Sequence, residues 1–255
     1  MLISTVSIIL CSVAALVAGF IDSIAGGGGF ITVPAMLLTG IPPHVALGSG
    51  KLGACLGSGI ALYNFARSGL VAWRVALVGV GFSLTGAYIG SRLTLFIDSA
   101  LLGKILVAML PLGIVFTLFP HRKSEPLPPV TEGLRFWLLA PLTCFTVGVY
   151  DGFFGPGTGT FFILAFHYAL RMSLLASSAT AKVLNFSSNA GSLVAFLASG
   201  NVAFVLALPM AVGSVLGNWL GSRMAIRLGG EVVRRFLVFS MVMLFVTLLY
   251  RYFLS

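Results

Sequence analysis

Apolar runs of about 20 residues follow one another through almost the whole chain, and they restrict the fold more than any other feature. A helix needs roughly 20 predominantly apolar residues to cross the hydrocarbon core of a bilayer. Only 8% of the 255 residues are charged, against about a quarter in a typical soluble domain. The outer surface must therefore face lipid. We predict an all-α integral membrane protein embedded in the lipid bilayer.

Glycine, proline and short polar clusters divide the chain into two sets of five apolar segments. The second segment of each set is too short to cross a bilayer as a helix, so we expect about 8–10 membrane segments that include broken or re-entrant helices. The segments lie at about 3–24, 30–38, 45–65, 71–89 and 101–119 in the first half, and at 136–154, 160–170, 174–198, 202–220 and 232–253 in the second.

Residues 120–135 form the one long polar and proline-rich stretch, which is typical of a linker. We expect residues 1–119 and 136–255 to be two transmembrane repeats. Either half alone would expose polar and glycine-rich backbone to lipid, which is costly. The two repeats should therefore form one folded membrane domain.

The same polar residues recur in the same order in both halves. Lys51 is matched by Lys182 at an offset of 131, and Asp22 is matched by Asp151 at an offset of 129. The difference predicts a short insertion between the glycine loop and the lysine of the second half. Further pairs are Gly19 and Gly148, Gly26 and Gly155, Gly28 and Gly157, Gly69 and Gly200, Gly86 and Gly217, Gly90 and Gly221, Ser91 and Ser222, and Arg92 and Arg223.

Arginines indicate how the repeats are oriented. Arg67 and Arg74 flank a turn in the first half, whereas the equivalent turn at Gly200 is uncharged and the next one contains Arg223 and Arg227. Because cytoplasmic loops are rich in Lys and Arg, equivalent loops should lie on opposite sides. This favours inverted repeats with a cytoplasmic linker and both termini outside. If the short second segments do not cross, the repeats are parallel instead.

Glycine-rich sequence interrupts the apolar pattern at corresponding places, at residues 26–29 and 155–159. Irregular backbone at membrane depth is tolerated only where protein buries it or water reaches it, and paired breaks in two repeats point to a transporter site. Freed amides and the positive end of the following half-helix can hold an anion. Gly27, Gly28, Gly157 and Thr158 are therefore candidate substrate-binding residues. The alternative is that the glycines only allow close helix packing.

Lys51 and Lys182 each stand near the start of a long apolar helix, and we predict that both bind an anion. Helical spacing places Asn185 and Asn189 on the same face as Lys182, and Ser58 on the face of Lys51. A polar stripe that begins with a lysine suits the wall of an aqueous cavity. The alternative is a lysine that reaches the membrane interface.

Asp22 and Asp151 each lie late in an apolar run, where a carboxylate is costly unless it is paired or functional. We expect these residues to carry a coupling proton or to neutralise a nearby lysine. A role in capping the glycine loops is equally open.

Other patterns exclude several classes of site. The sequence has no C-x-x-C pair and no H-E-x-x-H motif, so we expect no metal and no cofactor, and we read the three cysteines as packing residues. The net charge of +9 is spread between apolar runs, which does not suit nucleic acid. The apolar start of the chain lacks a cationic region and is predicted to be a retained helix. A homo-oligomer is left open.

The residues 19–29, GFIDSIAGGGG, followed by Val33-Pro34, resemble the signature of the sulfite exporter TauE/SafE family, also called the toluene sulfonate uptake permeases. Gly155-Pro-Gly-Thr-Gly159 and Thr180-Ala-Lys182 extend the resemblance to the second half, and the first half looks closest to YfcA-like members. The resemblance implies a bacterial inner-membrane transporter for sulfur-containing organic or inorganic anions, such as sulfite or a sulfonate.

We therefore predict a secondary transporter of a small anion that works by alternating access around a site near the membrane midplane, and not an enzyme. One alternative is an anion channel. Another is an intramembrane enzyme or assembly factor, which would need a convergent nucleophile or metal set.

Overall fold

A computed structural model describes residues 4–106, 132–229, 231–233 and 235–236. The described part of the chain is helical and contains no strand, as predicted. Residues 99–106 are also helical. The helices with defined bounds are α1 Thr5–Ala25, α2 Gly29–Leu38, α3 Pro43–Arg67, α4 Trp73–Leu95, α6 Gly133–Phe153, α7 Thr158–Ala169, α8 Leu174–Ala198 and α9 Phe204–Leu228.

Helix ends follow the local sequence. Ser4 and Ser173 accept hydrogen bonds from backbone amides in the first turns of α1 and α8, as N-cap residues do. Gly26 ends α1 with φ 78°, and Gly157 precedes α7 with φ 86°, conformations that favour glycine. The glycine-rich stretches therefore break the chain where the sequence predicts.

Among the described residues, four helices are long and apolar enough to cross a membrane: Thr5–Ala25, Pro43–Arg67, Phe136–Phe153 and Phe204–Leu228. The short helices differ from these. With 10 and 12 residues, α2 and α7 are about 15 and 18 Å long, well below the roughly 30 Å of a bilayer core. Neither can cross alone.

Two helices extend beyond the predicted apolar segments. The segment expected at 71–89 continues as α4 to Leu95, and the one expected at 202–220 continues as α9 to Leu228. Both extensions pass through a glycine that the sequence pattern treats as a breaker. Gly90 and Gly221 are instead inside the helices, where each lies against the backbone of a neighbouring helix.

The predicted insertion lies inside the short helix of the second half. The start of α7 follows the start of α2 at an offset of 129, and its end follows the end of α2 at an offset of 131. From there on the offset stays at 131, as the bounds of α3 and α8 show. The insertion therefore lengthens α7 without disturbing the glycine loop or the lysine helix.

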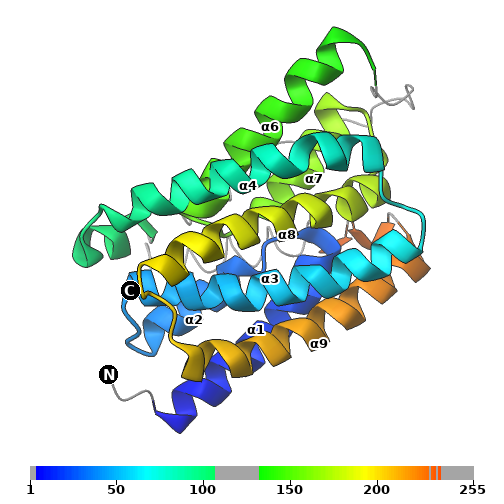
Figure 1. The fold of residues 1–255 in the computed structure, drawn as a ribbon. Coiled ribbons are helices and arrows are strands. Elements are labelled where there is room, and N and C mark those ends of the chain that lie inside the picture. The colour runs from blue at the N-terminus through cyan, green and yellow to red at the C-terminus, as the bar shows by residue number, and fades with distance from the viewer. Residues whose placement is uncertain (1–3, 107–131, 230, 234, 237–255) are drawn as a thin grey trace, which may run out of the picture.

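The two lysine helices, α3 and α8, lie side by side in the middle of the molecule (Figure 1). On one side α8 packs against α4, which packs against α6; on the other α3 packs against α9, which packs against α1. The first helix of each half thus packs on the fourth helix of the other half. Neither half is a separate packing unit.

Contacts between helices show their directions. Gly48 near the start of α3 approaches Phe196 near the end of α8, and Gly59 approaches Phe186, so α3 and α8 are antiparallel. Ser49 bonds Ala203 and Asn64 bonds Trp219, so α3 and α9 are parallel. By the same kind of contacts α1 is parallel to α9, and α4 and α6 are parallel to α8.

Two corresponding Gly-x-x-x-Gly motifs, Gly86 to Gly90 and Gly217 to Gly221, make close helix contacts. A Cβ at Gly90 would lie 2.1 Å from the Val149 carbonyl oxygen of α6, and one at Gly217 would lie 2.0 Å from the Leu16 carbonyl oxygen of α1. Only glycine permits this approach. These motifs therefore serve helix packing. Cys11, Cys55 and Cys144 are buried free thiols, consistent with a packing role.

Some predictions concern other parts of the chain. Most of the segments at 101–119 and 232–253, most of the linker at 120–135 and the C-terminus are outside the described residues. The domain bounds, the placement of the linker and the side on which the termini lie stay predictions.

Candidate functional site

The two glycine-rich breaks meet in the interior of the protein. A Cβ at Gly26 would lie 2.1 Å from the Thr160 amide nitrogen, and one at Gly29 would lie 2.8 Å from the Cα of Pro156. The Thr160 hydroxyl donates to the Ala25 carbonyl at 2.9 Å. Each break therefore packs on the start of the other half's short helix, and the glycines allow backbone to touch backbone.

Lys51 of α3 forms an ion pair with Asp151, which belongs to the other half. Its Nζ lies 2.8 Å from Asp151 Oδ1 and donates to the Asp151 carbonyl oxygen at 2.7 Å. Thr158 also donates to Asp151 Oδ1, at 2.7 Å. Both charged side chains are buried, with 7% and 3% of their surface exposed. Asp151 thus ties α3 to the second glycine break.

Lys182 of α8 makes the equivalent pair with Asp22 of the first half. Its Nζ lies 3.0 Å from Asp22 Oδ2 and also donates to the Asp22 carbonyl oxygen. Asn185 donates to the same Oδ2 at 3.5 Å, and the Gly28 amide donates to Oδ1 at 3.3 Å. Lys182 is fully buried, whereas the Asp22 side chain is 20% exposed. Both aspartates therefore lie where they neutralise a lysine of the other half.

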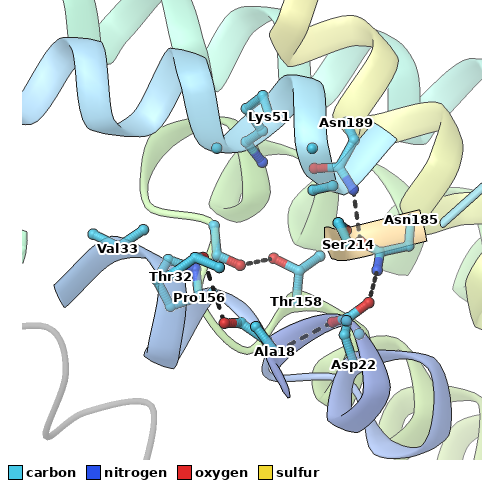
Figure 2. A pocket seen from close by; sticks show the side chains of 18 of the residues that line it. Ala18, Asp22, Thr32, Val33, Lys51, Pro156, Thr158, Asn185, Asn189 and Ser214 are labelled. Atoms are coloured by element: carbon cyan, nitrogen blue, oxygen red, sulfur yellow. Dashed lines mark hydrogen bonds between the residues drawn. The ribbon is translucent and has the colours of Figure 1, made fainter. Parts of the chain in front are cut away.

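A cavity of about 80 Å³ lies between the breaks and the lysine helices. Figure 2 shows Lys51 pointing into it from α3 with Asn189 near it in the view, and Asn185 and Asp22 below them. Asn189 donates to the Asn185 side chain at 3.4 Å, so a chain of amides extends from Asp22 along the α8 wall. A single water needs roughly 10–15 Å³ by a comparable measure, so the cavity can hold a small solute.

Most of the predicted site residues line this cavity. They are Asp22, Gly28, Lys51, Asp151, Gly157, Thr158, Asn185 and Asn189. Three others do not line it. Lys182 lies behind Asp22, Gly27 faces Phe30 and Thr160, and Ser58 is buried with its hydroxyl donating to Cys55.

Polar residues on α2 and α9 also line the cavity, and the sequence reasoning missed them. They are Thr32, Ser214 and Asn218. Asn218 lies in the middle of an apolar run, where an amide side chain is costly unless it has a partner or a function, and this signal could have identified it. Its amide donates to the Ser214 carbonyl at 2.9 Å, and its carbonyl oxygen is buried with no hydrogen-bond partner among the described residues.

On the other side of the α3–α8 pair, the space that corresponds to the cavity by the internal repeat is filled in the described part of the chain. Ala15 and Gly53 line it, but their counterparts Cys144 and Leu184 are buried in the main apolar core. A Cβ at Gly79 would lie 2.4 Å from the Cys144 sulfur and 2.7 Å from a Leu184 methyl. The larger side chains of Cys144 and Leu184 therefore fill the space that corresponds to the cavity in the other half.

The site has the donors that a small anion needs. The starts of α2 and α7 both reach the cavity, at Gly28 and Thr158, and helix N-termini favour negative charge. Lys51 adds an ammonium, and Asn189 an amide. The charges already present cancel, since two lysines face two carboxylates. In the described ranges no cluster of His, Cys, Asp and Glu could hold a metal ion.

Residues 11–248 match the family model described as sulfite exporter TauE/SafE. The chain is 41% identical over 243 residues to a probable membrane transporter protein, ORF9, of a Sinorhizobium species, covering 93% of this chain and 90% of that one. It is 37% identical over 237 residues to the probable membrane transporter protein YfcA of Escherichia coli K12, covering 92% and 87%.

A probable membrane transporter protein of Haemophilus influenzae is 37% identical over 250 residues, covering 97% of this chain and 96% of that one. No solved structure matches. Because the family match spans nearly the whole chain and the relatives are covered almost end to end, this chain belongs to the TauE/SafE family of membrane transporters.

Proposed function

We propose that this membrane transporter is a secondary carrier of a small anion, which binds in the cavity between the two glycine breaks. The proposal rests on two ion pairs between the halves, Lys51 with Asp151 and Lys182 with Asp22. They hold the two broken helices together, one from each half, with a lysine beside one cavity. Broken helices at corresponding positions of two repeats form the substrate site in many secondary transporters.

The anion is held by groups of both halves. Lys51, the Asn189 amide and the N-terminal ends of α2 and α7 surround the cavity, and Thr32, Ser214 and Asn218 contribute further hydrogen-bonding groups from α2 and α9. These donors act in a site lined mainly by buried residues, where each charge–dipole interaction is stronger than in solvent. Asp22 and Asp151 balance the charge of the lysines while the site is empty.

The substrate class is sulfur-containing oxyanions, organic or inorganic, such as sulfite or a sulfonate. The family description supports this class. The cavity volume of about 80 Å³ supports a compact anion rather than a large conjugate.

The carrier works by alternating access between inverted repeats. The antiparallel arrangement of α3 and α8 supports this, since the two helices are sequence equivalents. So does the lopsided packing, with a cavity on one side of the α3–α8 pair and an apolar core on the other. If the cavity closed on one side of the α3–α8 pair and an equivalent cavity opened on the other, the binding site would face the opposite side of the membrane.

The protein resides in the bacterial inner membrane. Arg67, Arg74 and Arg223 gather at one end of the molecule, because α3 and α9 are parallel and end together. This is the cytoplasmic end by the positive-inside rule. The bacterial relatives are named as membrane transporters.

Ligand binding to the detergent-purified protein tests the proposal first. A ligand that binds only the folded state raises its apparent stability, so sulfite, thiosulfate, ethanesulfonate, sulfate and acetate should raise the Tm to different extents. We expect a selective rise with a sulfur oxyanion. No shift with any sulfur anion at millimolar concentration would remove the substrate class.

Transport in proteoliposomes separates a carrier from an anion channel. A carrier shows saturation and accelerated uptake of labelled anion when unlabelled anion is trapped inside. Flux that rises linearly with concentration and shows no exchange would favour the channel. Chemical conversion of the anion would favour an intramembrane enzyme.

A further inference from the structure

The two ion pairs are not equivalent, although their residues correspond one to one. Asp22 accepts hydrogen bonds on both carboxylate oxygens, from Gly28 on Oδ1 and from Lys182 and Asn185 on Oδ2. Asp151 accepts only on Oδ1, from Lys51 and Thr158. Its Oδ2 is buried and has no hydrogen-bond partner among the described residues.

Two differences leave Asp151 with fewer donors than Asp22. The Gly28 amide donates to the Asp22 oxygen that lies away from the lysine, whereas the corresponding oxygen of Asp151 has no donor among the described residues. The second difference is an amide side chain on the lysine helix. Asn185 follows Lys182 by three positions and donates to Asp22. The residue three places after Lys51 is Ala54, whose methyl group cannot donate. Ala54 and Asp151 both line the cavity. The carboxylate beside Ala54 therefore lacks the amide donor that Asp22 has, and its Oδ2 has no partner among the described residues.

A buried carboxylate oxygen without a donor is costly, and a buried charge more so. Binding of an anion increases that cost. The four charges at the site cancel when it is empty, so an added anion leaves a net negative charge in a cavity lined mainly by buried residues. A proton on Asp151 removes both difficulties, because it neutralises the carboxylate and releases Lys51 to face the anion.

We propose that Asp151 Oδ2 binds the coupling proton of the transport cycle, and that the lack of an amide side chain at Ala54 helps to leave this carboxylate available for the proton. The proton comes from the aqueous phase that supplies the anion, binds to Oδ2, and returns to water when the anion leaves. No other bond is made or broken. Asp22, held by two further donors, stays ionised and keeps Lys182 in place. The inference rests on the proposed function, since it concerns the same cavity.

Few titratable groups face Asp151 in the described ranges. Lys51 comes from α3, Tyr150 lies next to Asp151 on α6, and the Asp22–Lys182 pair contributes to the same site from α1 and α8. Tyr150 donates its hydroxyl hydrogen to the Pro156 carbonyl. The α4 residues that contact this end of α6, Gly90 and Ser91, carry no charge, and the charged Arg74 of α4 lies over the Phe136 ring near the other end of α6. A metal cation is a poor alternative at Oδ2, because the Lys51 ammonium already lies 2.8 Å from Oδ1 of the same carboxylate.

Calorimetry of the full-length protein in detergent tests the proposal. Ethanesulfonate and thiosulfate are the probes, because both stay fully ionised over the working pH range and any proton taken up must bind the protein. Titration at one pH in two buffers with different ionisation enthalpies gives the protons bound per anion. We expect about one proton per anion in the wild type, and weaker anion binding as the pH rises.

Two substitutions of Ala54 separate the effect of a hydrogen-bond donor from the effect of a larger side chain. Ala54→Asn supplies the amide that Asn185 provides in the other half, so proton uptake per anion should fall towards zero. Ala54→Val has similar bulk and no donor, so the ratio should stay near that of the wild type even if affinity changes. Asp151→Asn mimics the protonated carboxyl and should bind the probes with no proton uptake and little pH dependence.

Infrared difference spectra give a readout that does not depend on affinity. Addition of ethanesulfonate should produce a protonated-carboxyl band that is missing in Asp151→Asn and present in Asp22→Asn. A band lost only in Asp22→Asn would overturn the proposal.

Three results would contradict the inference in different ways. Anion binding without proton uptake would mean that Asp151 does not gain a proton on binding, which overturns this inference and leaves the anion carrier standing. A requirement for sodium would do the same. Failure of the wild type to bind or exchange any sulfur anion would overturn the proposed function, and this inference with it.

Discussion

The Lys51 ammonium lies 2.8 Å from the Asp151 carboxylate, across the junction between the two halves of the chain. Lys182 and Asp22 repeat the relationship with the halves exchanged. Each half therefore supplies the counter-ion for the other half's lysine. A duplicated sequence thus becomes one interdependent site, and changes to one half act on the other.

Loss of Lys51 should affect both stability and transport. Lys51→Met leaves the buried Asp151 carboxylate without its cation, which typically costs about 3–5 kcal/mol. The double variant Lys51→Met/Asp151→Asn removes both charges and should recover most of that stability while still failing to bind anion. Thermal unfolding in detergent and anion exchange in proteoliposomes measure the two effects. Equal stability of the single and double variants would show that the two residues are not coupled.

Lys182 should behave differently from Lys51 because it lies behind Asp22 and is fully buried. Lys182→Met should lower the Tm at least as much as Lys51→Met. In the variant Lys182→Met/Asp22→Asn, which removes both charges, we expect residual anion binding, since neither the ammonium of Lys51 nor the start of α7 is altered. Complete loss of binding in this folded double variant would place Lys182 in direct contact with the anion.

The contact between the glycine breaks predicts a strong position dependence of alanine substitutions. Gly26→Ala puts a Cβ 2.1 Å from the Thr160 amide nitrogen, so the breaks must separate. Gly40 provides a matched control, because it has a similar positive φ of 79° but a Cβ at this position would meet no atom within 4 Å. Gly40→Ala should lower the free energy of unfolding only by the roughly 1–2 kcal/mol that a residue with a Cβ costs in a left-handed backbone conformation.

Gel filtration of the purified protein is the measurement for both variants. A folded variant elutes as one monodisperse peak at the yield of the wild type. We expect Gly40→Ala to pass this test and Gly26→Ala to fail it. If Gly26→Ala folds and transports like Gly40→Ala, backbone contact between the breaks is not needed.

Helix packing gives a second matched pair of glycines on one helix. A Cβ at Gly90 would lie 2.1 Å from the Val149 carbonyl oxygen, whereas one at Gly81 has open space around it. Gly90→Ala should force α4 away from α6 and destabilise the protein by about 1–3 kcal/mol, as overpacking does. Gly81→Ala should not destabilise it. The midpoints of thermal unfolding in detergent compare the two, and equal midpoints would contradict the packing role of Gly90.

The sequence predicted most helix positions because its signals are local. Apolar length, the glycine-rich breaks and the duplicated order of Asp22 and Lys51 determine where helices begin and which positions correspond. The helix ends beyond Gly90 and Gly221 were missed, because a glycine that breaks a helix and one that contacts a neighbouring helix look alike in sequence. Only the neighbouring backbone distinguishes them.

Pairing within the site could not be read from the sequence. Aspartate and lysine were both identified as site residues, but their partners depend on which helices pack together, and α1 packs on α9 of the other half. Ser58 occupies the position equivalent to Asn189, yet only Asn189 lines the cavity. This difference arises from the unequal packing on the two sides of the α3–α8 pair. Such packing cannot be predicted from the spacing of residues in the sequence.

The unequal packing makes a prediction about chemical access. Ser214 lines the cavity, whereas its counterpart in the first half, Ser83, is fully buried and donates to the Leu184 carbonyl at 2.9 Å. In a background without reactive cysteines, Ser214→Cys should react with a small, charged thiol reagent, and Ser83→Cys should react far more slowly. Ethanesulfonate or sulfite should protect Ser214→Cys, because we propose that the anion binds in the same cavity.

Labelling rates with the reagent added from either side of oriented vesicles measure this access. Alternating access requires a second packing in which the halves exchange roles, so conditions that drive exchange should raise the rate for Ser83→Cys and lower it for Ser214→Cys. Rates that stay fixed under exchange would mean that only one packing exists. Equal rates at both positions would mean that the cavity is continuous across the α3–α8 pair, as in a channel.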